Sequence, residues 1–226
     1  MPTPYDFTTL ARAATRIRVS TSDAELPALI TAASRALANF LGYEAHLREE
    51  VDETVVGQGG VYVWLRAGQV RQLHSVKVHG AELAEGEVAI DCPRAGRLVR
   101  RRGRWPFTGS STAGIVPIPL QAHDSGDIVV SFDSGWRTPG QVALALEAEP
   151  SSTLTSELPP ELEEAALLVL TAWYRRLGQD PDVTTKSLGD ASISWGADSM
   201  RGGKVAIPLI AAQLAAHHRK PGRGST

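Results

Sequence analysis

The chain has 226 residues, of which 42% are hydrophobic and 21% are charged, and its formal net charge is −2. A balance this near to neutral excludes a protein whose whole surface holds nucleic acid by neutralising phosphates. The apolar fraction is sufficient for a packed core, and the length suits one large domain or one domain with a sizeable insertion.

The single cysteine, Cys92, excludes an internal disulfide and suits a reducing compartment. The first ten residues lack the basic and apolar segments of a secretory signal. The longest apolar run, residues 165–174, is too short to cross a bilayer. We therefore expect a soluble protein with no membrane partner.

Helical signals stand at the start of the chain. A short helix is expected from near Asp6. Residues 22–25, Ser-Asp-Ala-Glu, are typical of a capping box. Apolar residues then recur at helical spacing as far as Leu41, and Gly42 supplies a C-terminal stop.

The pattern changes to strands after Gly42. Short segments in which apolar and polar residues alternate are separated by glycine-rich turns, and this spacing is typical of antiparallel strands. The expected strands are residues 61–66, 70–79, 87–91, 98–102, 127–133 and 142–149.

Helical signals return in the last third of the chain. A long helix is expected over 159–177, opening at two prolines, and a final helix from Pro208 to about residue 218. The sequence thus predicts an α+β fold: a helical bundle frame, built from the N-terminal helices, the 159–177 helix and the C-terminal helix, with an inserted antiparallel β section. The expected division is residues 1–42 and 156–226 for the helical part and 43–155 for the β-rich part.

Motifs of catalysis and cofactor binding are missing. The sequence has no HExxH, no CxxC pair, no Walker loop and no GxGxxG between strand and helix. His74 and His79 are five apart in one expected strand, so their side chains point to opposite faces. We therefore predict no enzyme, no metal and no other cofactor. A hydrolase that uses His123, Asp124 and a nearby serine is an alternative that no spacing supports.

A basic cluster lies near the middle of the chain, and it has two interpretations. It is either an edge that contacts DNA or an acidic partner, or a solvated hairpin whose charges protect a sheet edge from aggregation. The cluster comprises Arg97, Arg100, Arg101, Arg102 and Arg104.

The stretch KSLGDASISWG, residues 186–196, follows the expected long helix. Loops as long as the thirty residues from Gly178 to Ile207 are uncommon inside compact domains unless they are functional or disordered. The alternation in ASISW indicates a short strand that needs a neighbour. Trp195 has two interpretations of equal weight. It is either an anchor on a partner or a core residue packed on the 159–177 helix.

Several segments, taken in order along the chain, carry a resemblance to a known family. They are RALANFLGYEA, VYVWLRAGQVRQLHSVKVHG, IDCPRAGRLVRRRGRWP, DIVVSFDSGWRTP, LPPELEEAALLVLTAWYRR and SLGDASISW. Together they resemble the head–tail connector (adaptor) proteins of long-tailed bacteriophages and prophages. Two departures stand out: Lys186 occupies a place where the family often has an acidic residue, and residues 137–158 form an extra stretch.

The resemblance implies a structural virion protein at the head–tail interface, made in the host cytoplasm. It implies a homo-oligomeric ring, generally twelvefold, docked under the portal protein, with the next neck or tail protein on its opposite face. DNA would pass through the ring during ejection. The arginine cluster would then contact a partner or line the channel. The residues expected to contact the portal are Leu188, Trp195, Leu209, Ile210, Leu214, Arg219 and Lys220.

Two other functions remain open from the sequence. The first is another head-completion or tail-terminator virion protein. The second is a DNA-binding module that uses the arginine cluster, which would require steeply salt-dependent binding.

Overall fold

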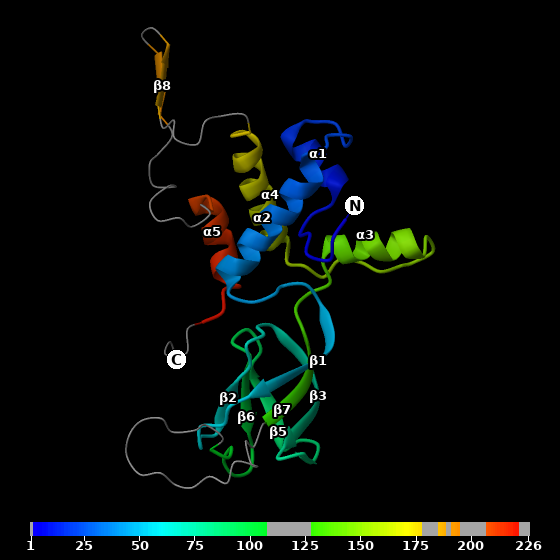
Figure 1. Cartoon of the computed structure of the whole chain (residues 1–226), viewed down its shortest axis with the longest axis vertical. Coiled ribbons are helices and arrows are strands. Elements are labelled where there is room, and N and C mark those ends of the chain that lie inside the picture. Colours follow the sequence, from blue (N-terminus) through cyan, green and yellow to red (C-terminus); the bar gives the residue numbers. More distant parts are fainter. Residues whose placement is uncertain (1, 108–127, 178–184, 189–190, 195–206, 222–226) are drawn as a thin grey trace. The chain divides into compact units, whose positions relative to one another are not determined.

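The computed structural model describes residues 2–107, 128–177, 185–188, 191–194 and 207–221. The chain forms two compact units (Figure 1). The helical unit comprises residues 1–41 and 137–219, and the β unit comprises residues 42–136 and 220–226. The predicted α+β class is confirmed.

Four helices of the helical unit pack on one another: α1 (Leu10–Ile17), α2 (Leu26–Leu41), α4 (Pro160–Tyr174) and α5 (Leu209–Ala216). Helix α4 lies at the centre, because it contacts each of the other three. Its apolar residues recur at helical spacing, which buries a continuous stripe. The buried residues of α4 are Leu162, Ala165, Ala166, Leu167, Val169 and Leu170.

The start of the chain differs in detail from expectation. Helix α1 begins at Leu10 rather than near Asp6, with Thr9 as its N-cap. The Asp6 carboxylate is buried and accepts hydrogen bonds from the Thr3 amide, the Thr3 hydroxyl and the Thr31 hydroxyl. Asp6 therefore ties the N-terminal segment to α2 instead of starting a helix.

The capping box predicted at residues 22–25 is not formed. The Glu25 amide donates to Asp23 Oδ1 at 2.9 Å, and the Tyr174 hydroxyl donates to Asp23 Oδ2 at 2.6 Å. The Tyr174 hydrogen bond is the main cause of the lowered pKa of Asp23. Asp23 thus joins the approach to α2 to the last turn of α4.

A fifth helix, α3 (Pro139–Ala148), stands where the strand 142–149 was predicted, and that prediction is wrong. Alternating Val142, Leu144 and Leu146 suggested the strand, but the residues just before them decide the structure. The Thr138 hydroxyl accepts from the Gln141 amide, and Gln141 Oε1 accepts from the Thr138 amide, each at 3.1 Å. This capping box, with Pro139 in the first turn, starts a helix. The helical unit therefore resumes at residue 137, whereas the expected boundary was residue 156.

The first turn of α3 is held against the N-terminal segment. Gly140 donates its amide to Asp6 O at 3.0 Å, and Thr138 Oγ1 donates to Pro4 O at 2.7 Å. A Cβ on Gly140 would lie 2.0 Å from Thr3 O. Only glycine permits this approach.

We expect Gly140→Ala to destabilise the helical unit by about 1–3 kcal/mol, because the added methyl group forces the backbone of the N-terminal segment away. Chemical denaturation followed by circular dichroism measures the loss. Gly60→Ala is the control, since the nearest atom to its Cβ would lie at 3.9 Å. Equal effects of the two substitutions would contradict the close approach at Gly140.

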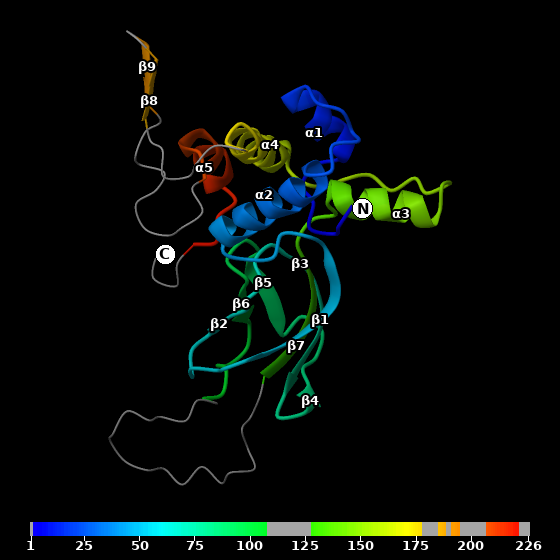
Figure 2. The ribbon, with the colours of Figure 1, turned by 45° about the horizontal axis from the view of Figure 1, so that its top comes forward.

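The β unit holds two antiparallel sheets (Figure 2). One has the order β1-β7-β3-β4 and the other the order β2-β6-β5. The strands are β1 (Arg48–Val55), β2 (Tyr62–Trp64), β3 (Val70–Val78), β4 (Ala81–Glu82), β5 (Val88–Cys92), β6 (Arg97–Arg100) and β7 (Ile128–Ser134).

The two sheets share one core. Strand β7 lies between β1 and β3, and every second residue of it is buried, as its alternating sequence predicts. Trp105 is part of this core, and only 1% of its surface is exposed. Its Nε1 donates a hydrogen bond to Val61 O at 3.0 Å. The buried members are Val55, Val63, Leu65, Ala67, Val70, Val76, Leu98, Trp105, Ile128, Val130 and Phe132.

Two further strands, β8 (Thr185–Leu188) and β9 (Ala191–Ser194), form a separate antiparallel pair. Leu188 pairs with Ala191, and Thr185 pairs with Ser194. The strand predicted in ASISW therefore exists over residues 191–194, and β8 is its neighbour.

Candidate functional site

The arginine cluster divides into two groups with different surroundings. Arg97 and Arg100, on β6, are used within the β unit. Arg97 Nε donates to Asp91 Oδ2 at 2.5 Å, and its guanidinium lies 4.9 Å from the Tyr62 ring centroid. Arg100 donates to Arg104 O at 2.9 Å and lies 3.7 Å from a Glu87 carboxylate oxygen. These two arginines hold β6 and its turn in place.

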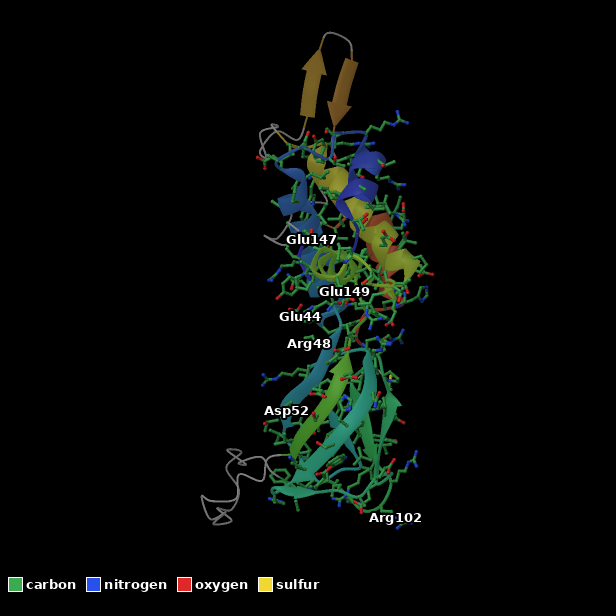
Figure 3. All side chains as sticks on the ribbon, turned by 90° about the vertical axis from the view of Figure 1, so that its right-hand side faces the viewer. Glu44, Arg48, Asp52, Arg102, Glu147 and Glu149 are labelled. Atoms are coloured by element: carbon green, nitrogen blue, oxygen red, sulfur yellow. The ribbon has the colours of Figure 1, made fainter. Side chains whose placement is uncertain are left out.

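The remaining three, Arg101, Arg102 and Arg104, are exposed in the segment that follows β6. Figure 3 shows Arg102 projecting from the end of the β unit. Charges so placed can meet an acidic partner or a phosphate without breaking an internal contact. The candidate contact surface is therefore smaller than the sequence cluster.

We expect the triple substitution of Arg101, Arg102 and Arg104 by serine to change the free energy of unfolding by no more than about 0.5 kcal/mol, as for other exposed residues. Replacing Arg97 and Arg100 by serine should cost about 1–3 kcal/mol, because charge-assisted hydrogen bonds are lost. Urea denaturation compares the two variants. A larger loss in the triple variant would contradict this division.

Helix α5 carries three of the residues predicted to contact the portal. Leu209 and Ile210 are exposed by 73% and 63%, whereas Leu214 is partly buried. Ala211 and Ala215 are fully buried, and α5 contacts α4 and α2. The helix thus docks by Ala211 and Ala215 and leaves Leu209 and Ile210 exposed, where they can meet another chain.

Arg219 and Lys220 both make contacts within the chain. The Arg219 guanidinium lies 5.3 Å from the centroid of the Phe40 ring, a cation–π distance. Lys220 Nζ donates to three carbonyl oxygens of the β unit: Leu65 at 2.7 Å, Arg66 at 2.8 Å and Ala67 at 3.2 Å. An ammonium group has three hydrogens, so these bonds use its whole donor capacity.

The last two predicted portal contacts are described only in part. The backbone of Leu188 ends β8, and the pairing of β8 with β9 is described. Trp195 and the side chain of Leu188 lie outside the described residues. Both interpretations of Trp195 therefore stay predictions.

The sequence reasoning missed a groove beside α3. It has a volume of about 430 Å³ and lies within the helical unit. The capping box at Thr138 was the signal that could have revealed α3 and hence one wall of this groove. The residues that line it are Pro2, Asp6, Thr8, Thr9, Leu10, Ala11, Pro27, Ile30, Pro139, Gly140, Ala143 and Glu147.

His74 forms a hydrogen-bonded pair with Asp133 in the β unit. His74 Nε2 lies 2.7 Å from Asp133 Oδ1, across β3 and β7. This hydrogen bond is the main cause that raises the pKa of His74. No group of three or more His, Cys, Asp or Glu residues that could hold a metal occurs among the described residues. His123 and Asp124 lie outside them.

A titration of His74 checks the pair with Asp133. The midpoint, followed by NMR, should lie above the ordinary value of 6.5, and Asp133→Asn should bring it back. Because the folded pKa is raised, the stabilisation is complete below pH 6.5 and is lost as the pH rises through the folded pKa. A midpoint unchanged by Asp133→Asn would contradict the pair.

No family model and no curated protein matches the chain. Within the described part of the chain, no helix is long and apolar enough to cross a membrane.

Solved structures do match. A chain in the neck of an empty gene transfer agent (GTA) particle, computed with C6 symmetry, is 15% identical with a TM-score of 0.53, over 97% of this chain and 93% of that one. A chain in the virion of a native GTA particle is 14% identical with a TM-score of 0.54, over 100% of this chain and 96% of that one. At such low identity these likenesses establish a common fold, and function has to be argued from sites.

Proposed function

We propose that this protein is a structural subunit of the neck of a tailed phage-like particle, a connector that forms a ring between the portal and the tail. The observation that carries the proposal is the likeness to a GTA neck chain over nearly the full length of both chains. A second support is independent of this likeness. Several segments of the sequence, taken in their order along the chain, resemble those of head–tail adaptors.

The ring is the first part of the proposal. The likeness to a chain from a neck computed with C6 symmetry supports a ring whose subunit number is a multiple of six, and twelve is the number we propose. A closed ring needs heterologous contacts, in which two different surfaces of the subunit meet. The portal would lie on one face of the ring, and the next neck or tail protein on the other.

The portal contact is the second part. We assign it to the stretch that contains β8 and β9, with Leu188 and Trp195 as anchors, because a two-stranded hairpin is marginally stable without further partners. Leu209 and Ile210 are exposed anchors for an intermolecular contact on α5. The ammonium group of Lys220 is bound to carbonyl oxygens of its own chain, so we propose that Lys220 supports the β unit rather than the portal contact.

Passage of DNA is the third part. A conduit should hold DNA weakly, because each neutralised phosphate adds salt-sensitive affinity. The net charge of −2 agrees with this requirement. Arg101, Arg102 and Arg104 would then contact a partner or the channel contents only transiently.

The test is the mass of the protein in solution, alone and mixed with the portal protein of the same particle. Light scattering gives the mass, and negative-stain images show whether rings form. We expect rings, either alone or on the portal. A monomer that ignores the portal at every concentration would overturn the proposal.

A DNA-binding module is the second candidate, favoured by the three exposed arginines of the β unit. Binding to duplex DNA would be measured over a range of salt concentrations. Three arginines can account for a slope of at most about 3 in log affinity against log salt. A slope near this value that disappears in the triple serine variant would favour the module, whereas the conduit predicts weak binding that the variant hardly changes.

A further inference from the structure

Helix α3 is apolar on nearly every side, yet it is buried only at its first turn. Pro139 and Gly140 are buried, Val142 and Leu144 are partly exposed, and Leu146 is 42% exposed. A helix that is hydrophobic all round normally lies inside a protein. The described residues of the helical unit leave most of α3 partly or fully exposed, so its apolar side chains form a candidate surface for contact with another chain.

The groove next to α3 gives that surface a place to enter. Ala143 and Glu147 form its wall on the α3 side, and Leu10, Pro27 and Ile30 contribute apolar atoms from the other elements. Its volume of about 430 Å³ is sufficient for several apolar side chains.

The acidic residues of α3 lie at its C-terminal end, where the helix dipole disfavours negative charge. Glu147 lies in the last turn, Glu149 is the C-cap, and the last turn holds no basic residue. The C-terminal end of a helix carries a partial negative charge, so carboxylates there are unfavourable unless a cation lies near. In Figure 3, where α3 is seen end on, both glutamates lie at its near end.

The opposite side of the helical unit carries the complementary features. Figures 1 and 2 place α5 and α3 on opposite sides of this unit, with α2 between them. Leu209 and Ile210 project from α5, and the helix has no acidic residue. His217 and Arg219 follow at its C-terminal end. One helix is apolar and ends in acids, and the other is apolar and ends in bases.

We propose that α3 and its groove bind α5 of a second copy of this chain, with the two helices parallel, their C-terminal ends together, and Leu209 and Ile210 beside Val142. The contact is heterologous and joins opposite sides of the subunit, as a ring requires. This inference rests on the proposed function, and it names the contact between neighbours in the ring.

Disulfide crosslinking tests the contact directly. In full-length protein with Cys92 replaced by serine, one chain carries Val142→Cys and another Ile210→Cys. We expect a crosslinked dimer only when the two chains are mixed, and a ladder of multimers when one chain carries both substitutions. Crosslinking of the Val142→Cys chain with itself would overturn the inference, because it indicates a two-fold contact. Rings that form without any crosslink would also overturn it.

Assembly of substituted chains provides a second readout. We expect Leu146→Asp, or the pair Leu209→Ser and Ile210→Ser, to raise the concentration at which half of the protein is assembled by about tenfold or more. The control is Val56→Asp, an apolar residue of the β unit that is 60% exposed, which should leave assembly unchanged.

The outcomes separate this inference from the proposed function. A wild-type protein that stays monomeric with and without the portal overturns both. Normal rings in the Leu209→Ser, Ile210→Ser variant, combined with loss of portal binding, overturn only the inference and return these two residues to the portal contact.

Discussion

Trp105→Ala should destabilise the β unit by about 3–5 kcal/mol, the cost of removing a large buried aromatic side chain. The indole is almost fully buried in the core that the two sheets share, and its Nε1 donates to Val61 O at 3.0 Å. The substitution leaves a cavity and removes one of the two hydrogen bonds to Val61 O, which also accepts from the Arg100 amide at 2.9 Å. Because two units need not unfold together, hydrogen exchange at the amides of β7 is the measurement that isolates the β unit.

Two variants show whether the effect belongs to burial. Phe107→Ala changes a nearby aromatic side chain that is 56% exposed, and it should cost no more than about 0.5 kcal/mol. Trp105→Phe keeps an aromatic ring but loses the hydrogen bond, and an intermediate loss is expected. Equal losses for Trp105→Ala and Phe107→Ala would show that Trp105 is not a core residue.

Lys220→Ala should destabilise the same unit by about 2 kcal/mol, because hydrogen bonds from a charged donor are stronger than neutral ones. Its ammonium group joins the three consecutive carbonyl oxygens of Leu65, Arg66 and Ala67. This segment lies against Gly96, where a Cβ would meet Ala67 O at 2.2 Å. Loss of Lys220 should speed hydrogen exchange at the Leu65 amide, which is bonded to Gly96 O.

The matched control is Lys77→Ala, which removes an exposed lysine from β3 of the same unit. It should leave both stability and exchange unchanged. Lys220→Met keeps most of the aliphatic stem, so a loss equal to that of Lys220→Ala would assign the effect to the charge. No effect of either Lys220 variant would contradict the contact.

The position of Lys220 also decides how the portal contact should be tested. Deleting residues 187–226 would remove α5 and Lys220 together, and with them contacts of both units. Unfolding of such a deletion would therefore say nothing about the portal. Substitution of Leu188 and Trp195 alone avoids this problem.

Local patterns identified most of the β unit and most of the helices. Strands β3 and β7 were predicted because their apolar residues alternate, and α4 because its apolar stripe follows a proline start. Strand β1 was missed, since five of its eight residues are charged and its apolar side chains are few. It pairs with β7, and this long-range pairing, rather than its own composition, makes it a strand.

The α3 segment shows where local patterns conflict. Alternating Val142, Leu144 and Leu146 favoured a strand, but alanines between them favour a helix. The capping box of Thr138 and Gln141 decides for the helix. That box was present in the sequence, so this error was avoidable.

Composition was sufficient to locate two sets of candidate contact residues, the basic cluster and the apolar end of the chain. It could not show which members of each set are exposed and which make contacts inside the protein. Arg97 and Arg102 are alike in sequence, yet one pairs with Asp91 and the other is exposed. Leu209 and Leu214 lie on one helix, and only packing on α4 and α2 separates the exposed side chain from the partly buried one.

Capping, alternation and helical spacing act over a few residues, so the α+β class and most element positions follow from the amino-acid order alone. Contacts between distant segments are different. Lys220 meets a carbonyl oxygen 155 residues earlier in the chain, and Asp23 meets Tyr174 across 151. Such pairs form only when packing has brought the segments together, because nothing in either local pattern specifies the other. The same holds for the exposed faces of α3 and α5, which appear as candidate assembly surfaces only after the helices have been placed.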